Sequence, residues 1–320
     1  MSLLTPYHYH RAPLLIARLA FALAAWFSFP GMTTFVDQPS PTGLAQYFDF
    51  TWLAGREPIL FGVTAFELTR LVLAAACIVY ALGFADLLTL PVILFATVSI
   101  GTLNNSQGAI THHLQIVPLV ALGQWIFAGF WAVRFRGLRA CALAPSWDST
   151  WLARDRWFLF VGQQMVVATY LVTALTKLRV SGLGWIADAR YFPLQLLKSE
   201  RMDYYNTVSA QGSPPEAGFA DALAARIAHA FAEFPDLARA GLSMGLFLEL
   251  SAFLALLGPR WSVCMGGALI LFHLTISRVM NLNFTFNVAL LAGFFVVPPL
   301  VAGITAWSRH RTRRHRRAAA

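Results

Sequence analysis

Eight apolar stretches of this chain approach the length at which a helix crosses a membrane. A transmembrane helix needs about 20 predominantly apolar residues to span the hydrocarbon core. The stretches are residues 13–29, 60–83, 87–103, 110–133, 157–178, 239–258, 261–279 and 286–307. They predict an all-α fold, a polytopic membrane bundle of eight transmembrane helices, with residues 1–308 as a single transmembrane domain.

The composition supports the same fold class. Apolar residues make up 58% of the 320 residues and charged residues only 12%, whereas a soluble domain has roughly 25% charged residues. This deficit of charge excludes a cytosolic protein, a disordered chain and a disulfide-stapled secreted module. The three cysteines (Cys77, Cys141 and Cys264) are far apart and lack the spacing of a metal or redox motif.

The positive charge is concentrated in one tail. Six of the 24 basic residues lie between Arg309 and Arg317, and without them the formal net charge of +9 falls to +3. A basic face for nucleic acid is therefore not expected, and residues 309–320 are assigned as a basic cytoplasmic tail. The connection 134–156 is also rich in arginine. Because basic residues accumulate in cytoplasmic connections, eight spans place both termini in the cytoplasm of a cell-membrane (inner-membrane) protein.

Two long segments then face outward, residues 31–59 and 179–238. Both are rich in aromatic residues, and the second contains Phe219, Leu223, Ile227 and Phe231 at helical spacing. Amphipathic aromatic segments of this kind pack at the membrane interface. A substrate entrance on the outer face is the alternative.

Ionisable residues inside apolar spans are costly and need partners. Glu67 and Arg70 lie three residues apart and fit an ion pair on one helix face. Glu249 has no partner on its own span, so we expect it to face a cavity or to meet a cation from another helix. His273, in the middle of the seventh span, fits either a hydrogen-bonded link between helices or a catalytic role.

The fourth span begins close to Asn104 and Asn105 and contains the adjacent histidines His112 and His113. Neighbouring side chains on a helix point about 100° apart, so these two are not expected to bind one metal ion together. One of them is expected to face the interior of the bundle. The sequence predicts no metal site.

Lys177 is one of only two lysines in the chain and lies at the end of the fifth span. A lysine at this position can extend to the lipid headgroups as an anchor. Alternatively, a lysine that faces a cavity loses its proton readily and becomes a general base.

Three motifs resemble the membrane core of the vitamin K-dependent gamma-carboxylase family, which includes the bacterial horizontally transferred transmembrane domain proteins. The motifs are Leu103-Asn-Asn-Ser with Thr111-His-His-Leu, Tyr170 to Leu178 followed by Gly184-Trp185, and Phe272-His-Leu with Asn281-Leu-Asn-Phe. Their order and spacing fit the family over about residues 10–300. The resemblance implies an integral membrane enzyme that uses reduced vitamin K or another quinol.

In the carboxylases, a lysine acts as base toward vitamin K hydroquinone, oxygen adds, and the resulting strong base removes a proton from a glutamate that then captures carbon dioxide. By resemblance, Lys177 is that lysine. The candidate catalytic residues are Lys177, His112, His113 and His273. The candidate substrate- or cofactor-binding residues are Asn104, Asn105, Tyr170, Trp185, Glu249, Glu67 and Arg70.

The carboxylases carry a large additional luminal portion that helps to recognise their protein substrates, and this sequence ends soon after its last predicted span. We therefore expect base chemistry on a quinol or similar lipid-soluble molecule rather than carboxylation of peptide glutamate. The expected partners are the lipid bilayer and this small molecule, with a peptide or protein substrate left open. The alternatives are a non-catalytic membrane partner or maturation factor, and a transporter that uses the intramembrane Glu and Arg residues.

Overall fold

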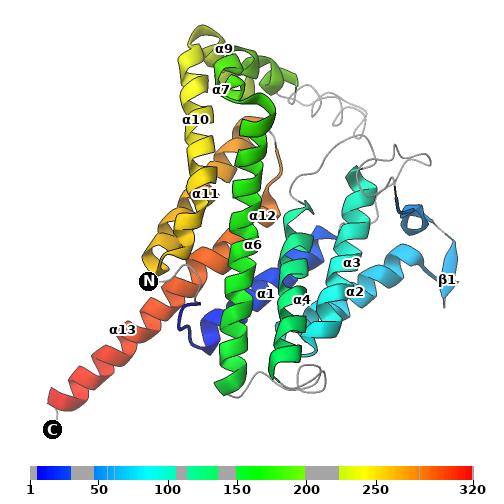
Figure 1. The fold of residues 1–320 in the computed structure, drawn as a ribbon, viewed down its shortest axis with the longest axis vertical. Helices are drawn as coiled ribbons and strands as arrows, with labels where there is room; N and C mark the ends of the chain where they lie inside the picture. Colours follow the sequence, from blue (N-terminus) through cyan, green and yellow to red (C-terminus); the bar gives the residue numbers. More distant parts are fainter. Residues whose placement is uncertain are drawn as a thin grey trace.

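Long helices packed side by side make up most of the molecule (Figure 1). The computed structural model describes residues 6–29, 47–55, 57–60, 62–105, 114–135, 149–198, 223–280 and 282–318. The longer helices are α1 (Arg11–Ser28), α2 (Ala65–Ala81), α3 (Asp86–Asn105), α4 (Ile116–Phe135), α6 (Ser149–Ser181), α10 (Pro235–Ser251), α11 (Pro259–Met280) and α13 (Val297–Ala318). The short elements are η2 (Thr51–Ala54), α7 (Gly184–Ala187), η4 (Asp188–Tyr191), α9 (Leu223–Glu233), η6 (Ala252–Leu256), α12 (Thr285–Leu291), η7 (Ala292–Val296) and the antiparallel pair β1 (Pro58–Leu60) and β2 (Val63–Thr64).

Within these described ranges, seven helical segments are long and apolar enough to cross a membrane. They are Arg11–Ser28, Asp86–Asn105, Ile116–Arg134, Leu152–Ser181, Pro235–Leu256, Pro259–Met280 and Thr285–Ser308. The all-α, multi-pass membrane fold expected from the apolar stretches is therefore confirmed. The second predicted span corresponds to α2, which has 17 residues.

The start of α2 differs from the predicted span 60–83. The chain first forms the β1–β2 pair, and the helix begins only at Ala65. Thr64 and Glu67 form a capping box, in which Glu67 accepts hydrogen bonds from the Thr64 N–H (2.9 Å) and hydroxyl (3.0 Å). The Arg70 guanidinium lies 5.0 Å from the centre of the Trp26 ring. Glu67 thus caps its helix and Arg70 packs on α1, so the ion pair predicted between them is wrong.

Helix α6 connects the two sides of the bundle. It packs against α4 on one side and against α10 and η6 on the other. Its 33 residues extend for about 50 Å, which exceeds a hydrocarbon core of about 30 Å. The C-terminal end of α6 contacts α7, and α7 and α9 lie beside the N-terminal end of α10 (Figure 1).

The last span contains a π-helical turn, η7, between α12 and α13. A π turn displaces backbone carbonyls from the regular helical hydrogen-bond pattern. Gln163 on α6 donates to the carbonyl of Phe294 (2.7 Å), and Ser262 on α11 donates to that of Phe295 (2.9 Å). Two buried polar side chains thus donate hydrogen bonds to carbonyls of this turn. These contacts fix the rotation of α12 relative to α6 and α11.

We expect Gly293→Ala to destabilise the protein by about 1–3 kcal/mol, because overpacking a close helix contact forces backbone shifts. A Cβ atom at Gly293 would collide with the Cβ of Ala20 on α1. Gly303→Ala on the same span is the control, since its added Cβ meets nothing within 4 Å. Unfolding in mixed detergent and SDS micelles measures both variants, and equal midpoints for the two would contradict the close contact.

Candidate functional site

Lys177 forms an ion pair with a carboxylate from another span. Its Nζ lies 2.7 Å from each side-chain oxygen of Glu249 on α10. The Lys177 side chain is 25% exposed and that of Glu249 only 8%. Of the two environments expected for Glu249, the structure has the second, a cation contributed by a different helix.

The chain beyond Lys177 folds back over it. Gly182 adopts a positive φ of 57°, which ends α6 and which a residue with a side chain rarely adopts. The following helix α7 then brings the Trp185 ring to 5.2 Å from Lys177 Nζ. Lys177 is therefore held by a carboxylate and an indole ring.

A second polar pair lies two helical turns deeper on α6. The Tyr170 hydroxyl is 2.6 Å from Nε2 of His273 on α11, and both side chains are buried. The Phe284 ring packs on His273 with a centroid distance of 4.5 Å, and Phe272 lies on it at 5.6 Å. His273 is thus both a hydrogen-bonded link between helices and part of a polar group surrounded by aromatic rings.

Asn287 on α12 joins the two polar pairs into one group. Its side chain lies close to the Tyr170 hydroxyl, and Tyr170 in turn lies within electrostatic range of Glu249. The charge of Lys177 likewise acts on the His273 ring. We call this group the Lys177 cluster. It consists of Tyr170, Lys177, Trp185, Glu249, His273 and Asn287.

The structure therefore brings together five of the residues singled out from the sequence, and it adds Asn287. Lys177, Tyr170, Trp185, Glu249 and His273 come from three spans and α7. His112 and His113 lie outside the described residues. Asn104 and Asn105 end α3, which packs against α2 and α4, and Glu67 and Arg70 make the contacts of α2 described above.

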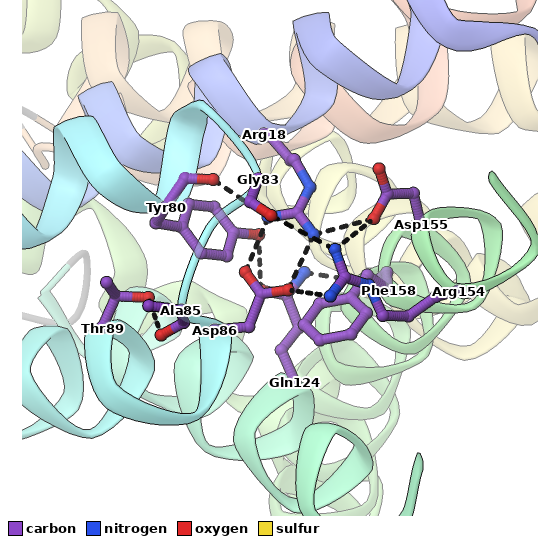
Figure 2. Close-up of polar contacts among 10 residues, drawn as sticks. All are labelled: Arg18, Tyr80, Gly83, Ala85, Asp86, Thr89, Gln124, Arg154, Asp155 and Phe158. Carbon is purple, nitrogen blue, oxygen red and sulfur yellow. Dashed lines mark hydrogen bonds and ion pairs between the residues drawn. The ribbon is translucent and has the colours of Figure 1, made fainter. Parts of the chain in front are cut away.

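A second group of charges lies near the start of α6 (Figure 2). Arg18 on α1 binds Asp86 on α3 and Asp155 on α6, each at 2.8 Å. Arg154 binds the same two carboxylates, each at 3.3 Å. All four residues are at most 6% exposed. We call this group the four-charge network.

The four-charge network is balanced within itself. Two arginines face two carboxylates, and Arg18 also donates to the carbonyl of Tyr80 at 2.9 Å and lies over the Phe158 ring (Figure 2). Such a neutral, hydrogen-bonded group joins helices at their ends and leaves no net charge for a substrate. We assign it to the stability of the bundle.

Comparisons with known proteins give no family assignment. No protein-family model matches the chain, and no curated protein or solved structure matches it. Among the described residues, no three His, Cys, Asp or Glu side chains converge as metal ligands. The resemblance to the gamma-carboxylase core therefore stays a prediction.

Proposed function

We propose that this protein is an eight-span enzyme of the cell (inner) membrane with both termini in the cytoplasm. Helix α2, about 26 Å long, supplies the eighth span with the help of the hairpin before it. An even number of spans keeps the arginine-rich connection and the basic tail on the cytoplasmic side. In this orientation the Lys177 end of α6 faces the outer leaflet.

We propose that the Lys177 cluster transfers a proton from a lipid-soluble hydroxyl compound, a reduced quinone by resemblance. The observation that carries this proposal is the pairing of Lys177 with the buried carboxylate of Glu249 at 2.7 Å. Ionisable residues inside a membrane bundle are a functional-site hypothesis by default, since their burial is costly. A lysine whose amine is held between a buried carboxylate and an indole ring supports a chemical role over that of an anchor.

The Lys177–Glu249 pair has the properties of a proton-transfer couple. Burial penalises separate charges, so the neutral pair of amine and carboxylic acid comes closer in energy to the ion pair than it does in water. When the proton moves from Lys177 Nζ to Glu249, the amine gains a free electron pair. The pKa values of a phenol and an amine are both about 10, so the neutral amine is well matched to accept a phenolic proton.

The cluster also fits a polar ligand that arrives from the bilayer. Nδ1 of His273 and Oδ1 of Asn287 are buried and, within the described residues, have no hydrogen-bond partner. The outer faces of the same helices carry exposed apolar side chains, including Val172, Phe247 and Leu271, as expected of surfaces that contact lipid. A reduced quinone would supply two electrons and a phenolic proton at this position.

Two alternatives receive less support from the same contacts. A transporter path through Glu67, Arg70 and Glu249 is disfavoured, because Glu67 caps its own helix and Arg70 lies on Trp26. A non-catalytic partner does not need Lys177 and His273 to converge. Their convergence on one cluster favours the enzyme.

The purified protein in detergent, given vitamin K hydroquinone and oxygen, is expected to form the quinone epoxide. Mass spectrometry of the extracted lipid detects the product, and heat-denatured protein provides the background. Epoxide at background level, in protein that remains folded by thermal unfolding, would overturn the quinol assignment.

A further inference from the structure

The segment that carries Trp185 is joined to α6 by a left-handed turn. Gly182 has a φ of 57°, and its N–H still donates to the carbonyl of Leu178 at 2.9 Å. This conformation ends α6 and reverses the chain. Helix α7 therefore returns toward the end of α6 and brings Trp185 to Lys177.

Helix α7 has little packing of its own. None of its four residues is buried, and the first buried residue after the turn is Ala189 in η4. A segment with few buried contacts opens locally at a small cost in free energy. We call residues 182–187 the α7 lid. It is tethered at Gly182 and Ala189, and between them it is held by partly exposed contacts with α6 and α10.

The Trp185 ring forms part of the cover over the Lys177 amine. Its centre lies 5.2 Å from Nζ, and the two Glu249 oxygens contact the same nitrogen at 2.7 Å. An ammonium group close to an indole face is attracted to it. The ring is 40% exposed, and the Lys177 side chain beneath it is 25% exposed. The ring can therefore move away from the amine without opening the core of the bundle.

We propose that the α7 lid gates Lys177, so that an aromatic substrate reaches the amine only when the lid turns away at Gly182. The inference rests on the proposed function, in which Nζ accepts the proton of a phenolic hydroxyl. Proton transfer requires the hydroxyl oxygen within about 3 Å of Nζ. The attraction between the indole ring and the ammonium group closes the lid, and the ring of an entering substrate takes the place of the indole.

Amine labelling tests the lid without a turnover assay, because the chain contains only two lysines. The full-length protein in detergent reacts briefly with 1-fluoro-2,4-dinitrobenzene, an amine reagent the size of a quinone ring. Mass spectrometry then gives the arylated fraction of Lys177 relative to Lys198, which is exposed. Trp185→Leu should raise this ratio roughly 3- to 30-fold, the range that corresponds to the loss of a cation–π contact. Trp125→Leu on α4 removes a ring of similar exposure, 38%, and should leave the ratio unchanged.

A matched pair of variants tests the turn at Gly182. A Cβ atom at this position meets nothing within 4 Å, so a substitution acts through the backbone conformation and not through a clash. Asparagine tolerates a positive φ, whereas a β-branched residue does not. Gly182→Val should therefore raise the arylation of Lys177, and Gly182→Asn should behave as the wild type.

Reductive methylation with formaldehyde, a reagent much smaller than an indole ring, separates the cover from the reactivity of the amine. The lid predicts equal methylation of Lys177 in the wild type and all four variants. Arylation unaffected by Trp185→Leu, equal arylation of the two Gly182 variants, or methylation that rises together with arylation would each overturn the lid. A lid that passes these tests in a protein that makes no epoxide would instead overturn the proposed reaction and leave the lid standing.

Discussion

Lys177→Ala is expected to lower quinol turnover by roughly 100- to 10,000-fold, the usual contribution of a positioned acid–base group. We expect the variant to keep the fold, because the substitution removes a side chain that is 25% exposed at the end of α6. It leaves the Glu249 carboxylate without its cation, and this group then takes up a proton. Epoxide formation under oxygen, measured by mass spectrometry, gives the loss of activity.

Two further variants separate the proton transfer from the ion pair. Lys177→Arg retains a cation for Glu249, but a guanidinium does not give up its proton in proteins, so this variant should be as inactive as alanine. Lys198→Ala removes the second lysine of the chain, which is exposed, and should keep full activity. Full turnover by both Lys177 variants would exclude this lysine as the base.

The apolar stretches predict the spans closely because burial in lipid is encoded locally in the sequence. Helices α1, α3 and α11 begin and end within two residues of their predicted stretches. The predicted start of α2 was wrong because the apolar residues Leu60 and Val63 belong to the paired strands β1 and β2. The signal for the helix start is the Thr64–Glu67 capping box. A search for capping pairs would have found it.

The partners in the Lys177 cluster could not be predicted from the sequence. Tyr170 and His273 are 103 residues apart, and their contact depends on how each helix is rotated about its axis. Hydropathy does not specify this rotation when helices are apolar on most faces. The cost of a charge in lipid did predict that Glu249 needs a partner, but it did not identify the residue.

The four-charge network was missed for a different reason. Asp86 and Asp155 lie just before the apolar stretches 87–103 and 157–178, so a search inside the spans passes over them. Arg154 was counted only as a cytoplasmic charge, although it is 2% exposed. Opposite charges at the ends of neighbouring spans are the signal that would have found the network.

Arg18→Leu is expected to destabilise the protein by about 3–5 kcal/mol, the cost of breaking a buried ion pair by removing one partner. Asp86 and Asp155 would then share Arg154 alone, and an uncompensated negative charge would remain between α1, α3 and α6. The matched control is Arg239→Leu, whose pair with Asp236 is exposed and should change stability by no more than about 1 kcal/mol. SDS-induced unfolding of the purified variants measures the difference.

The double variant Arg18→Leu/Asp155→Leu tests whether charge balance is the cause. It removes one cation and one anion and leaves the pair of Arg154 and Asp86. We expect it to be more stable than Arg18→Leu alone, because the remaining charges again cancel and leucine packs well in an apolar site. If the second substitution added its own destabilisation to the first, the packing of Arg18 over the Tyr80 and Phe158 rings would account for the stability, and charge balance would not.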